Sequence, residues 1–525
     1  MDENKIFFKT VCNLAIPVAL QSMLQSSFSI VDQIMIGQLG SVSVAGVGLA
    51  GKFSSIFSVM VSAVSAVAGI MIAQYIGQKN QSDIRRSFSV NLALAAILAA
   101  LFTVICVAFP SQVMSLYSTD EQTVHAASGY LAILAGTFLP SAGASLLAAM
   151  FRCMEKARLP LHASITAALL NTVLNYILIF GKCGFVPMGA NGAAIATLIS
   201  QIANFLIMFF LMCRHDIYLR RKNADRYWQT GFNYRQYAAM LLPVLVCEFM
   251  WSLGENVYAA IYGRLGTEST AAMTLINPVQ SLVIGALCGL SQAAGIIIGK
   301  MLGANKYEKA YTASKKLILY GFVSSVFLSL LVIAGSRYYV EIYQVEDSVK
   351  QLTRQILLAY AMISPFKVQN MIIGGGIIRS GGKTKYIMAI DLIGTWIFGV
   401  PLGLFSAFVL RLSIPYVYFI LSLEECVRFA ISVMILRRKK WMNNKYARAV
   451  MIIADHSAPA VFLLIARLFM LMKVFLSRSH PAPDVALGFV GVQNFSCFAG
   501  QGQIDLEEPL GNIWSCQGRN KKFRI

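Results

Sequence analysis

The stretch AIPVALQSMLQSSFSIVDQIMIGQLG, residues 15–40, decides the fold class of this chain. It is long and apolar enough to cross a bilayer as a helix, and its one charged side chain is Asp32. A carboxylate in the hydrocarbon core costs at least about 2.5–3.5 kcal/mol, so it is expected to face a partner, the bundle interior or a water-filled cavity. Three polar side chains accompany Asp32: Gln21, Gln25 and Gln33. Pro17 removes a backbone hydrogen bond near the start of the helix, which predicts a hinge there.

The composition extends this interpretation to the whole chain. Of the 525 residues, 57% are hydrophobic and 13% are charged, whereas soluble proteins carry about 25% charged residues. Apolar runs of roughly 20 residues, the length that crosses a bilayer, recur along the sequence. We therefore predict an all-α polytopic membrane protein with twelve transmembrane helices, at 12–36, 47–76, 87–109, 125–150, 161–180, 190–213, 237–262, 276–302, 313–335, 350–376, 385–409 and 413–436.

Lysine and arginine are distributed unevenly between these spans. Alternate connecting segments hold 22 of them on one side of the membrane and five on the other. Because basic residues hold loops in the cytoplasm, we expect both termini there. The net charge of +20 then reflects these loops, and we expect the lipid bilayer, and no nucleic acid, as a partner of a monomeric protein.

An internal repeat divides the chain. Pro17 and Pro243 are 226 residues apart, and so are three glycine pairs, Gly37 and Gly263, Gly40 and Gly266, and Gly77 and Gly303. This spacing predicts two pseudo-symmetric six-helix lobes, as in several secondary transporter folds. The lobes are expected at 1–213 and 237–440, joined by a basic cytoplasmic linker at 214–236. An atypical tail, 441–525, follows, with an apolar run at 458–476 that favours an interfacial helix.

The first lobe contains a candidate ion site. Asn171 and Asn175 lie four residues apart in the fifth span, which places both amides on one helix face. Together with Asp32 and the hydroxyl of Thr197 in the sixth span, they could form an oxygen-rich site for a hard cation or a proton. The alternatives are a structural carboxylate at Asp32, hydrogen bonds between helices for the asparagines, and close packing for Thr197.

The second lobe has different charges. The repeat places Tyr258 where the first lobe has Asp32. Glu248 lies near the middle of the seventh span and therefore needs a partner, for which Lys367 in the tenth span is the candidate. Such a pair is either structural or, with Gln33, part of a substrate site or a second proton site. We also predict structural pairing for Asp391, Glu424, Glu425 and Arg428.

Several function classes have no support in the sequence. It has no phosphate-binding P-loop, which argues against ATP-driven transport, and no HExxH motif. No arrangement of Ser, His and Asp stands out as a catalytic triad. We therefore expect a secondary transporter that is not an enzyme and needs no cofactor.

Over about residues 10–440 the chain resembles the multidrug and toxic compound extrusion (MATE) family of efflux transporters, prokaryotic type. The resemblance is carried by VDQIMIGQLG in the first span, NTVLNYILIFG in the fifth, GANGAAIAT in the sixth, LPVLVCEFMWSLGENVYAAIYGRLGTESTAA in the seventh and IRSGGKTKY after the tenth. It implies two six-helix lobes around a V-shaped cavity, alternating access, and export of small organic cations in exchange for Na⁺ or H⁺.

The resemblance also implies roles for single residues. Family ion-site positions fall on Asp32, Asn171, Asn175 and Thr197. Some members have Asp where Asn175 stands, and one branch has an essential acidic residue where this chain has Trp251. The alternative function is a lipid-linked oligosaccharide flippase, whose fold is related and whose cavity would be strongly cationic.

Overall fold

The computed structural model describes residues 3–214, 234–343 and 345–442, all of which belong to one compact unit, residues 1–481. In this described part every regular element is a helix, and no strand is present. Most of the predicted linker at 214–236 lies outside the described residues. So does almost all of the predicted tail, including the helix expected at 458–476.

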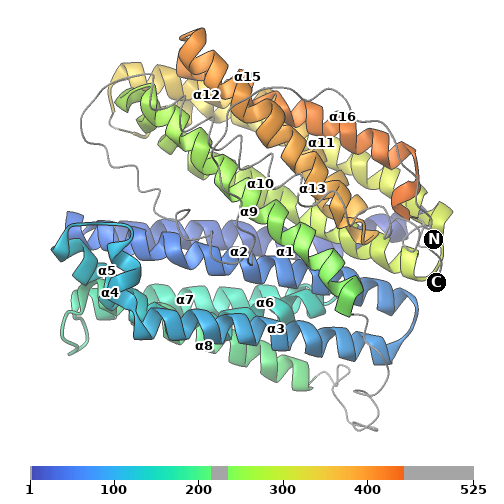
Figure 1. Ribbon diagram of the computed structural model, residues 1–525, viewed down its shortest axis with the longest axis horizontal. Coiled ribbons are helices and arrows are strands. Elements are labelled where there is room, and N and C mark those ends of the chain that lie inside the picture. Colours follow the sequence, from blue (N-terminus) through green and yellow to red (C-terminus); the bar gives the residue numbers. More distant parts are fainter. Residues whose placement is uncertain (1–2, 215–233, 344, 443–525) are drawn as a thin grey trace, which may run out of the picture. The chain divides into compact units, whose positions relative to one another are not determined.

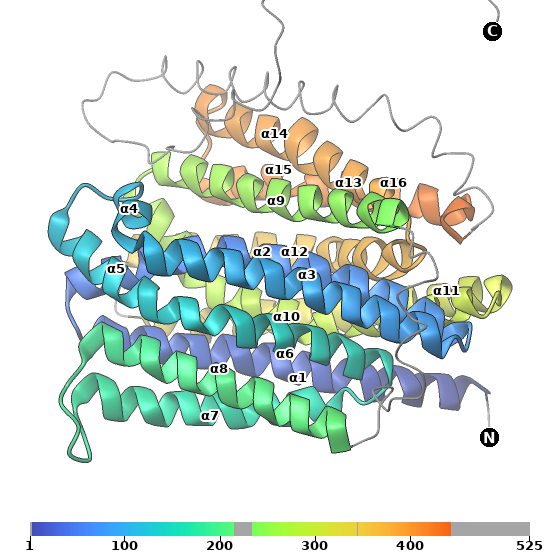
Figure 2. The ribbon, with the colours of Figure 1, turned by 60° about the horizontal axis from the view of Figure 1, so that its bottom comes forward.

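The N-terminal half consists of long helices joined by short turns (Figure 1). Its elements are α1 (Glu3–Gly37), α2 (Ser41–Gly77), α3 (Gln81–Ala108), α4 (Pro110–Ser115), α5 (Glu121–Leu134), the 3₁₀ turn η1 (Ala135–Thr137), α6 (Phe138–Cys153), α7 (Arg158–Phe180) and α8 (Gly189–Arg214). Helices α7 and α8 pack side by side, and α7 also contacts α1 (Figure 2).

The C-terminal half has the same order of long helices, but three π-helical segments interrupt it. Its elements are α9 (Tyr234–Arg264), α10 (Thr267–Gly303), α11 (Tyr307–Glu341), α12 (Asp347–Asn370), π-helical η3 (Met371–Ile378), α13 (Thr384–Leu392), π-helical η4 (Ile393–Gly399), α14 (Val400–Leu404), π-helical η5 (Phe405–Val409), α15 (Ile414–Ser422), α16 (Glu424–Arg437) and η6 (Lys440–Met442). π-helical turns are rare and frequently mark functional sites.

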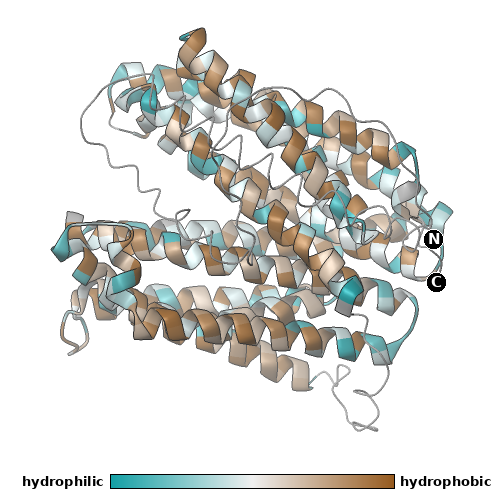
Figure 3. Cartoon of the chain, viewed as in Figure 1, coloured by the Kyte–Doolittle hydropathy of each residue, from teal (hydrophilic) through white to brown (hydrophobic). Residues whose placement is uncertain are grey.

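The all-α polytopic fold class is confirmed. Eleven helices of the described residues have the length and hydropathy needed to cross a membrane. Hydrophobic residues run along these helices, and hydrophilic ones gather at many of the ends (Figure 3). The twelfth predicted span, 413–436, is divided at Leu423 into α15 and α16, so neither piece reaches the 18 residues of a complete span. Its interior carries the buried charges Glu424, Glu425 and Arg428, which lower its hydropathy.

The repeated glycines occupy equivalent turns. Gly40 precedes α2 with a φ of 91°, and Gly266 precedes α10 with a φ of 112°. Both values lie in the left-handed region that glycine adopts without steric cost. The chain therefore turns in the same way after α1 and after α9. This shared turn explains why glycine recurs at these two positions of the repeat.

Helices α2 and α10 contact each other backbone to backbone at a second pair of repeated glycines. A Cβ on Gly77 would lie 2.1 Å from the carbonyl oxygen of Lys300, and one on Gly303 would lie 2.0 Å from that of Gln74. The two halves make further polar contacts at this end. Gln74 Nε2 donates to the carbonyl oxygen of Ser380 at 2.6 Å, and Lys300 forms an ion pair with Glu155 at 2.6 Å.

We expect Gly77→Val to destabilise the folded protein. The added side chain would press on the α10 backbone, which cannot rotate away, and overpacking of this kind costs about 1–3 kcal/mol or more. The measurement is the apparent melting temperature of the purified protein in detergent. Gly48→Val is the matched control, because Gly48 lies in the same helix and a Cβ there has no atom within 4 Å. An equal melting temperature for both variants would contradict this interpretation of the α2–α10 contact.

Candidate functional site

Three helices bring the four predicted ion-site residues together. Asp32 comes from α1, Asn171 and Asn175 from α7, and Thr197 from α8. Asn175 Nδ2 donates to Asp32 Oδ1 at 2.7 Å and to Asn171 Oδ1 at 3.2 Å. Asn171 Nδ2 donates to Thr197 Oγ1 at 3.3 Å. The carboxylate of Asp32 therefore lies in a continuous polar network.

One acceptor in this network has no partner. Asn175 is 1% exposed, and within the described part of the chain its Oδ1 accepts no hydrogen bond. Turning over the amide of Asn171 lets its nitrogen donate to Asp32 Oδ1 at 3.0 Å and its oxygen accept from the backbone nitrogen of Thr197 at 3.3 Å. In either orientation the carboxylate accepts from amide groups only, with no basic side chain paired to it, and an unused buried oxygen lies beside it. Such an oxygen-rich group suits a hard cation or a proton.

The local sequence explains this arrangement. The spacing of four residues places Asn171 and Asn175 on one face of α7, as predicted. Gly192 lets α8 approach closely, because a Cβ there would lie 2.8 Å from the backbone of Leu178. Sequence reasoning missed Tyr130 of α5, a buried residue close enough to Asp32 to interact with it electrostatically. A tyrosine in an apolar span carries no pattern that reveals its partner.

The other residues predicted for the first span do not join this network. Gln33 is exposed and makes no hydrogen bond with any described residue. Pro17 lies inside α1, which continues as one helix from Glu3 to Gly37, so the hinge stays a prediction.

The predicted pair of Glu248 and Lys367 is wrong. Glu248 Oε1 forms an ion pair with Arg379 Nη2 at 3.0 Å, and both side chains are largely buried. Arg379 follows the predicted span 350–376. In the structure the π-helical η3 lengthens that span and places Arg379 opposite α9. Lys367, on the preceding α12, interacts electrostatically with Glu425 and Glu255 instead.

Of the four charges for which structural pairing was predicted, Asp391, Glu424 and Arg428 lie together, whereas Glu425 accepts a hydrogen bond from Asn370 at 2.8 Å. The guanidinium of Arg428 lies 3.6 Å from Asp391 and 3.6 Å from Glu424, and it donates to Thr395. Tyr258 donates to Glu424 at 2.6 Å. The residue that the repeat places opposite Asp32 thus binds a carboxylate rather than supplying one.

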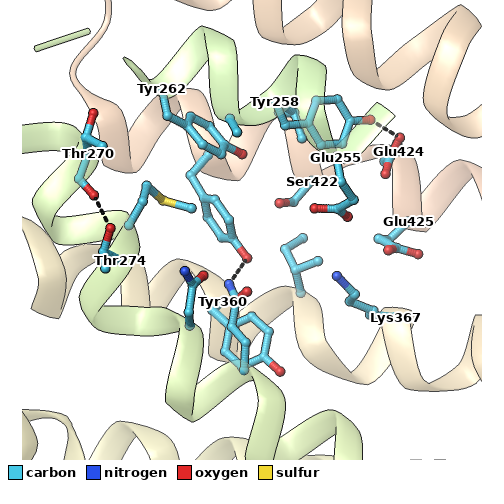
Figure 4. Close-up of a pocket in the computed structure, with 17 residues that line it drawn as sticks. Glu255, Tyr258, Tyr262, Thr270, Thr274, Tyr360, Lys367, Ser422, Glu424 and Glu425 are labelled. Carbon is cyan, nitrogen blue, oxygen red and sulfur yellow. Dashed lines mark hydrogen bonds between the residues drawn. The ribbon is translucent and has the colours of Figure 1, made fainter. Parts of the chain in front are cut away.

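A cavity of about 220 Å³ lies beside this charged network (Figure 4). It is bounded by α9, α10, α12, α15 and α16. Its charged lining consists of Glu255, Lys367, Glu424 and Glu425, and tyrosines form much of the wall. Lys367 therefore reaches a cavity, whereas Glu248 and Gln33, which we had grouped with it, are not part of the lining. Within the described residues no group of three or more His, Cys, Asp and Glu side chains could hold a metal ion.

Comparison with known proteins gives a family and a fold. The family model MatE matches residues 17–177 and 243–405, so its two matches begin at the repeated prolines, Pro17 and Pro243. "Probable multidrug resistance protein YoeA" of Bacillus subtilis is 24% identical over 416 residues, which cover 76% of this chain and 87% of that protein. "Probable multidrug resistance protein NorM" of Thermotoga maritima is 22% identical over 397 residues, which cover 75% of this chain and 84% of that protein.

Solved structures agree with this relationship at the level of fold. A MATE crystallised in complex with MaL6 superposes with a TM-score of 0.76 at 18% identity, covering 83% of this chain and 96% of that one. A mutant of the Vibrio cholerae MATE transporter VcmN gives a TM-score of 0.76 at 16% identity, covering 83% and 99%. With matches to both repeats and the same helical architecture, the chain belongs to the multidrug and toxic compound extrusion (MATE) family of transporters.

Proposed function

We propose that this protein is a secondary active multidrug efflux antiporter, which exports small organic cations by alternating access in exchange for Na⁺ or H⁺. It would work in the cytoplasmic membrane of a bacterium, with both termini in the cytoplasm. Two relatives named as probable multidrug resistance proteins, YoeA and NorM, support drugs as the class of substrate.

The single observation that carries the proposal is the environment of Asp32. Its carboxylate lies within a membrane-spanning helix, accepts a 2.7 Å hydrogen bond from Asn175, and has no basic side chain paired to it in the described structure. A charge in such a place is stabilised when a cation or a proton binds. Asn171, Asn175 and Thr197 supply the further oxygens that would complete the site.

The coupling follows from the position of this site. Asp32 takes up an ion from outside, which changes its hydrogen bonds to α7 and therefore the packing of α1 on α7. The bend at Pro17 would transmit this change along α1, which also packs on α10 of the other half. The substrate leaves, and release of the ion inside resets the protein. In one-for-one exchange a tenfold ion gradient, worth about 1.4 kcal/mol, sustains a tenfold substrate gradient.

The flippase alternative is less well supported by the charges. A lipid-linked pyrophosphate needs a cationic cavity, because phosphate is bound by arginine and lysine. The described cavity has three glutamates and one lysine in its lining. Its lining therefore lacks the cluster of basic groups that a pyrophosphate needs.

The test uses proteoliposomes loaded with ethidium. We expect efflux of the dye when an inward gradient of either Na⁺ or protons is imposed, and none without a gradient, because the coupling ion supplies the driving force. The effective gradient identifies the ion. Protein-free liposomes under the same gradients are the control. Dye efflux at the same rate with and without both gradients would contradict the antiporter proposal.

A further inference from the structure

Two opposite charges in the cavity of the second lobe make no direct hydrogen bond or ion pair with the described residues. Glu255 from α9 and Lys367 from α12 both line it, and their charged ends point toward each other across it (Figure 4). Neither makes a hydrogen bond or an ion pair with any described residue. Lys367 interacts electrostatically with Glu425 as well as with Glu255. Glu255 and Lys367 are therefore too far apart to pair directly.

The other two carboxylates around the cavity already accept hydrogen bonds. Glu424 accepts from Tyr258 at 2.6 Å and faces Arg428 at 3.6 Å. Glu425 accepts from Asn370 at 2.8 Å. The groups left for a ligand are thus one carboxylate that only accepts hydrogen bonds and one ammonium with three donors.

A ligand with both charges fits these two groups better than a ligand with one. A simple cation would meet Glu255 but would bring a like charge toward Lys367. A simple anion would meet Lys367 but would approach Glu255 and Glu425. A zwitterion satisfies both groups and leaves the net charge of the cavity unchanged.

The walls indicate what should lie between the two charges. Tyr258, Tyr262, Tyr360 and Tyr418 line the cavity, and tyrosine rings pack well on flat aromatic groups. The volume of about 220 Å³ also suits a single ring, since a cavity of about 150 Å³ holds benzene.

We propose that this cavity binds an aromatic zwitterion, with the ammonium of the ligand at Glu255, its carboxylate at Lys367 and its ring between the tyrosines. Lys367 thereby determines which charge pattern is accepted. Only the statement that such a ligand is exported rests on the proposed function. Binding itself needs no ion gradient.

The test is isothermal titration calorimetry with the purified protein in detergent and three matched compounds. 4-(Aminomethyl)benzoate carries an ammonium and a carboxylate at opposite ends of one ring. Its methyl ester keeps only the positive charge, and 4-methylbenzoate keeps only the negative charge. We expect the zwitterion to bind at least about tenfold more tightly than either of the others, the factor that corresponds to about 1.4 kcal/mol. Equal or tighter binding of the ester, or no binding of the zwitterion, would overturn the proposal.

Two substitutions locate the site. We expect Lys367→Gln to weaken binding of the zwitterion about tenfold and to strengthen binding of the ester, because a like charge is removed. Glu255→Gln should weaken binding of both the zwitterion and the ester, because each places its ammonium at Glu255. Lys309→Gln and Glu341→Gln make the same chemical changes at exposed side chains outside the cavity. They should change the affinity for neither the zwitterion nor the ester. Unchanged binding in both cavity variants would place the ligand elsewhere and overturn the assignment.

The comparison of the three ligands on the unmodified protein tests the preference for a zwitterion even if a variant fails to fold. It is also independent of the antiporter proposal. A protein that binds the zwitterion but shows no gradient-driven efflux would support this site and contradict the proposed function. A protein that exports ethidium but binds none of the three compounds would do the reverse.

Discussion

Asp32→Asn is expected to abolish gradient-driven export. The substitution keeps the size of the side chain and can still bond to Asn175, but it removes the only charge of the polar network formed with Asn171, Asn175 and Thr197. Without that charge the site has no reason to bind a cation or a proton, so the ion gradient no longer drives the substrate. Under a tenfold ion gradient, the ethidium gradient should fall from about tenfold to none. The measurement is dye efflux from proteoliposomes.

The matched control is Asp347→Asn. Asp347 lies in the first turn of α12 with a fully exposed side chain, so the same chemical change should leave efflux as it is. Binding of ethidium to the purified Asp32→Asn protein should persist, which separates lost coupling from lost folding. If the Asp32→Asn protein still concentrated the dye against a gradient, the coupling ion would have to bind at another site.

The second large effect is expected at Arg428. This residue is 7% exposed, and its guanidinium faces both Asp391 and Glu424. Arg428→Met would leave the buried carboxylate of Glu424 and the partly buried carboxylate of Asp391 without their counter-ion. Removal of one partner from a buried ion pair costs about 3–5 kcal/mol, which is a large fraction of the total stability of a protein. We expect little folded protein, measured as the monodisperse fraction in size-exclusion chromatography and as the apparent melting temperature.

Two further variants test the cause of this loss. Arg264→Met removes an arginine of the same lobe whose side chain is exposed, and it should be tolerated. Adding Asp391→Asn and Glu424→Gln to Arg428→Met should restore part of the stability, because the uncompensated charges are then gone. A normal melting temperature for Arg428→Met alone would show that the network is not needed for folding.

Much of the architecture could be predicted because its causes are local or periodic. A helix in lipid must satisfy its backbone hydrogen bonds within itself, so apolar length alone predicts a membrane-spanning helix. The division at Leu423 escaped prediction, because a length of apolar sequence does not say where a helix breaks. The repeat was visible because a turn that needs a left-handed residue, as at Gly40 and Gly266, leaves a glycine in the sequence.

The sequence by itself determined the membrane class, the twofold repeat and the face of α7 that carries Asn171 and Asn175. Only the tertiary structure decided which charges meet. Glu248 pairs with Arg379 and not with Lys367, although all three lie in or near apolar spans. The physical reason is that a pairing over 131 residues depends on how α9 packs against the end of a π-helical segment. No spacing along the chain records such a contact, and the same holds for the cavity that places Lys367 opposite Glu255.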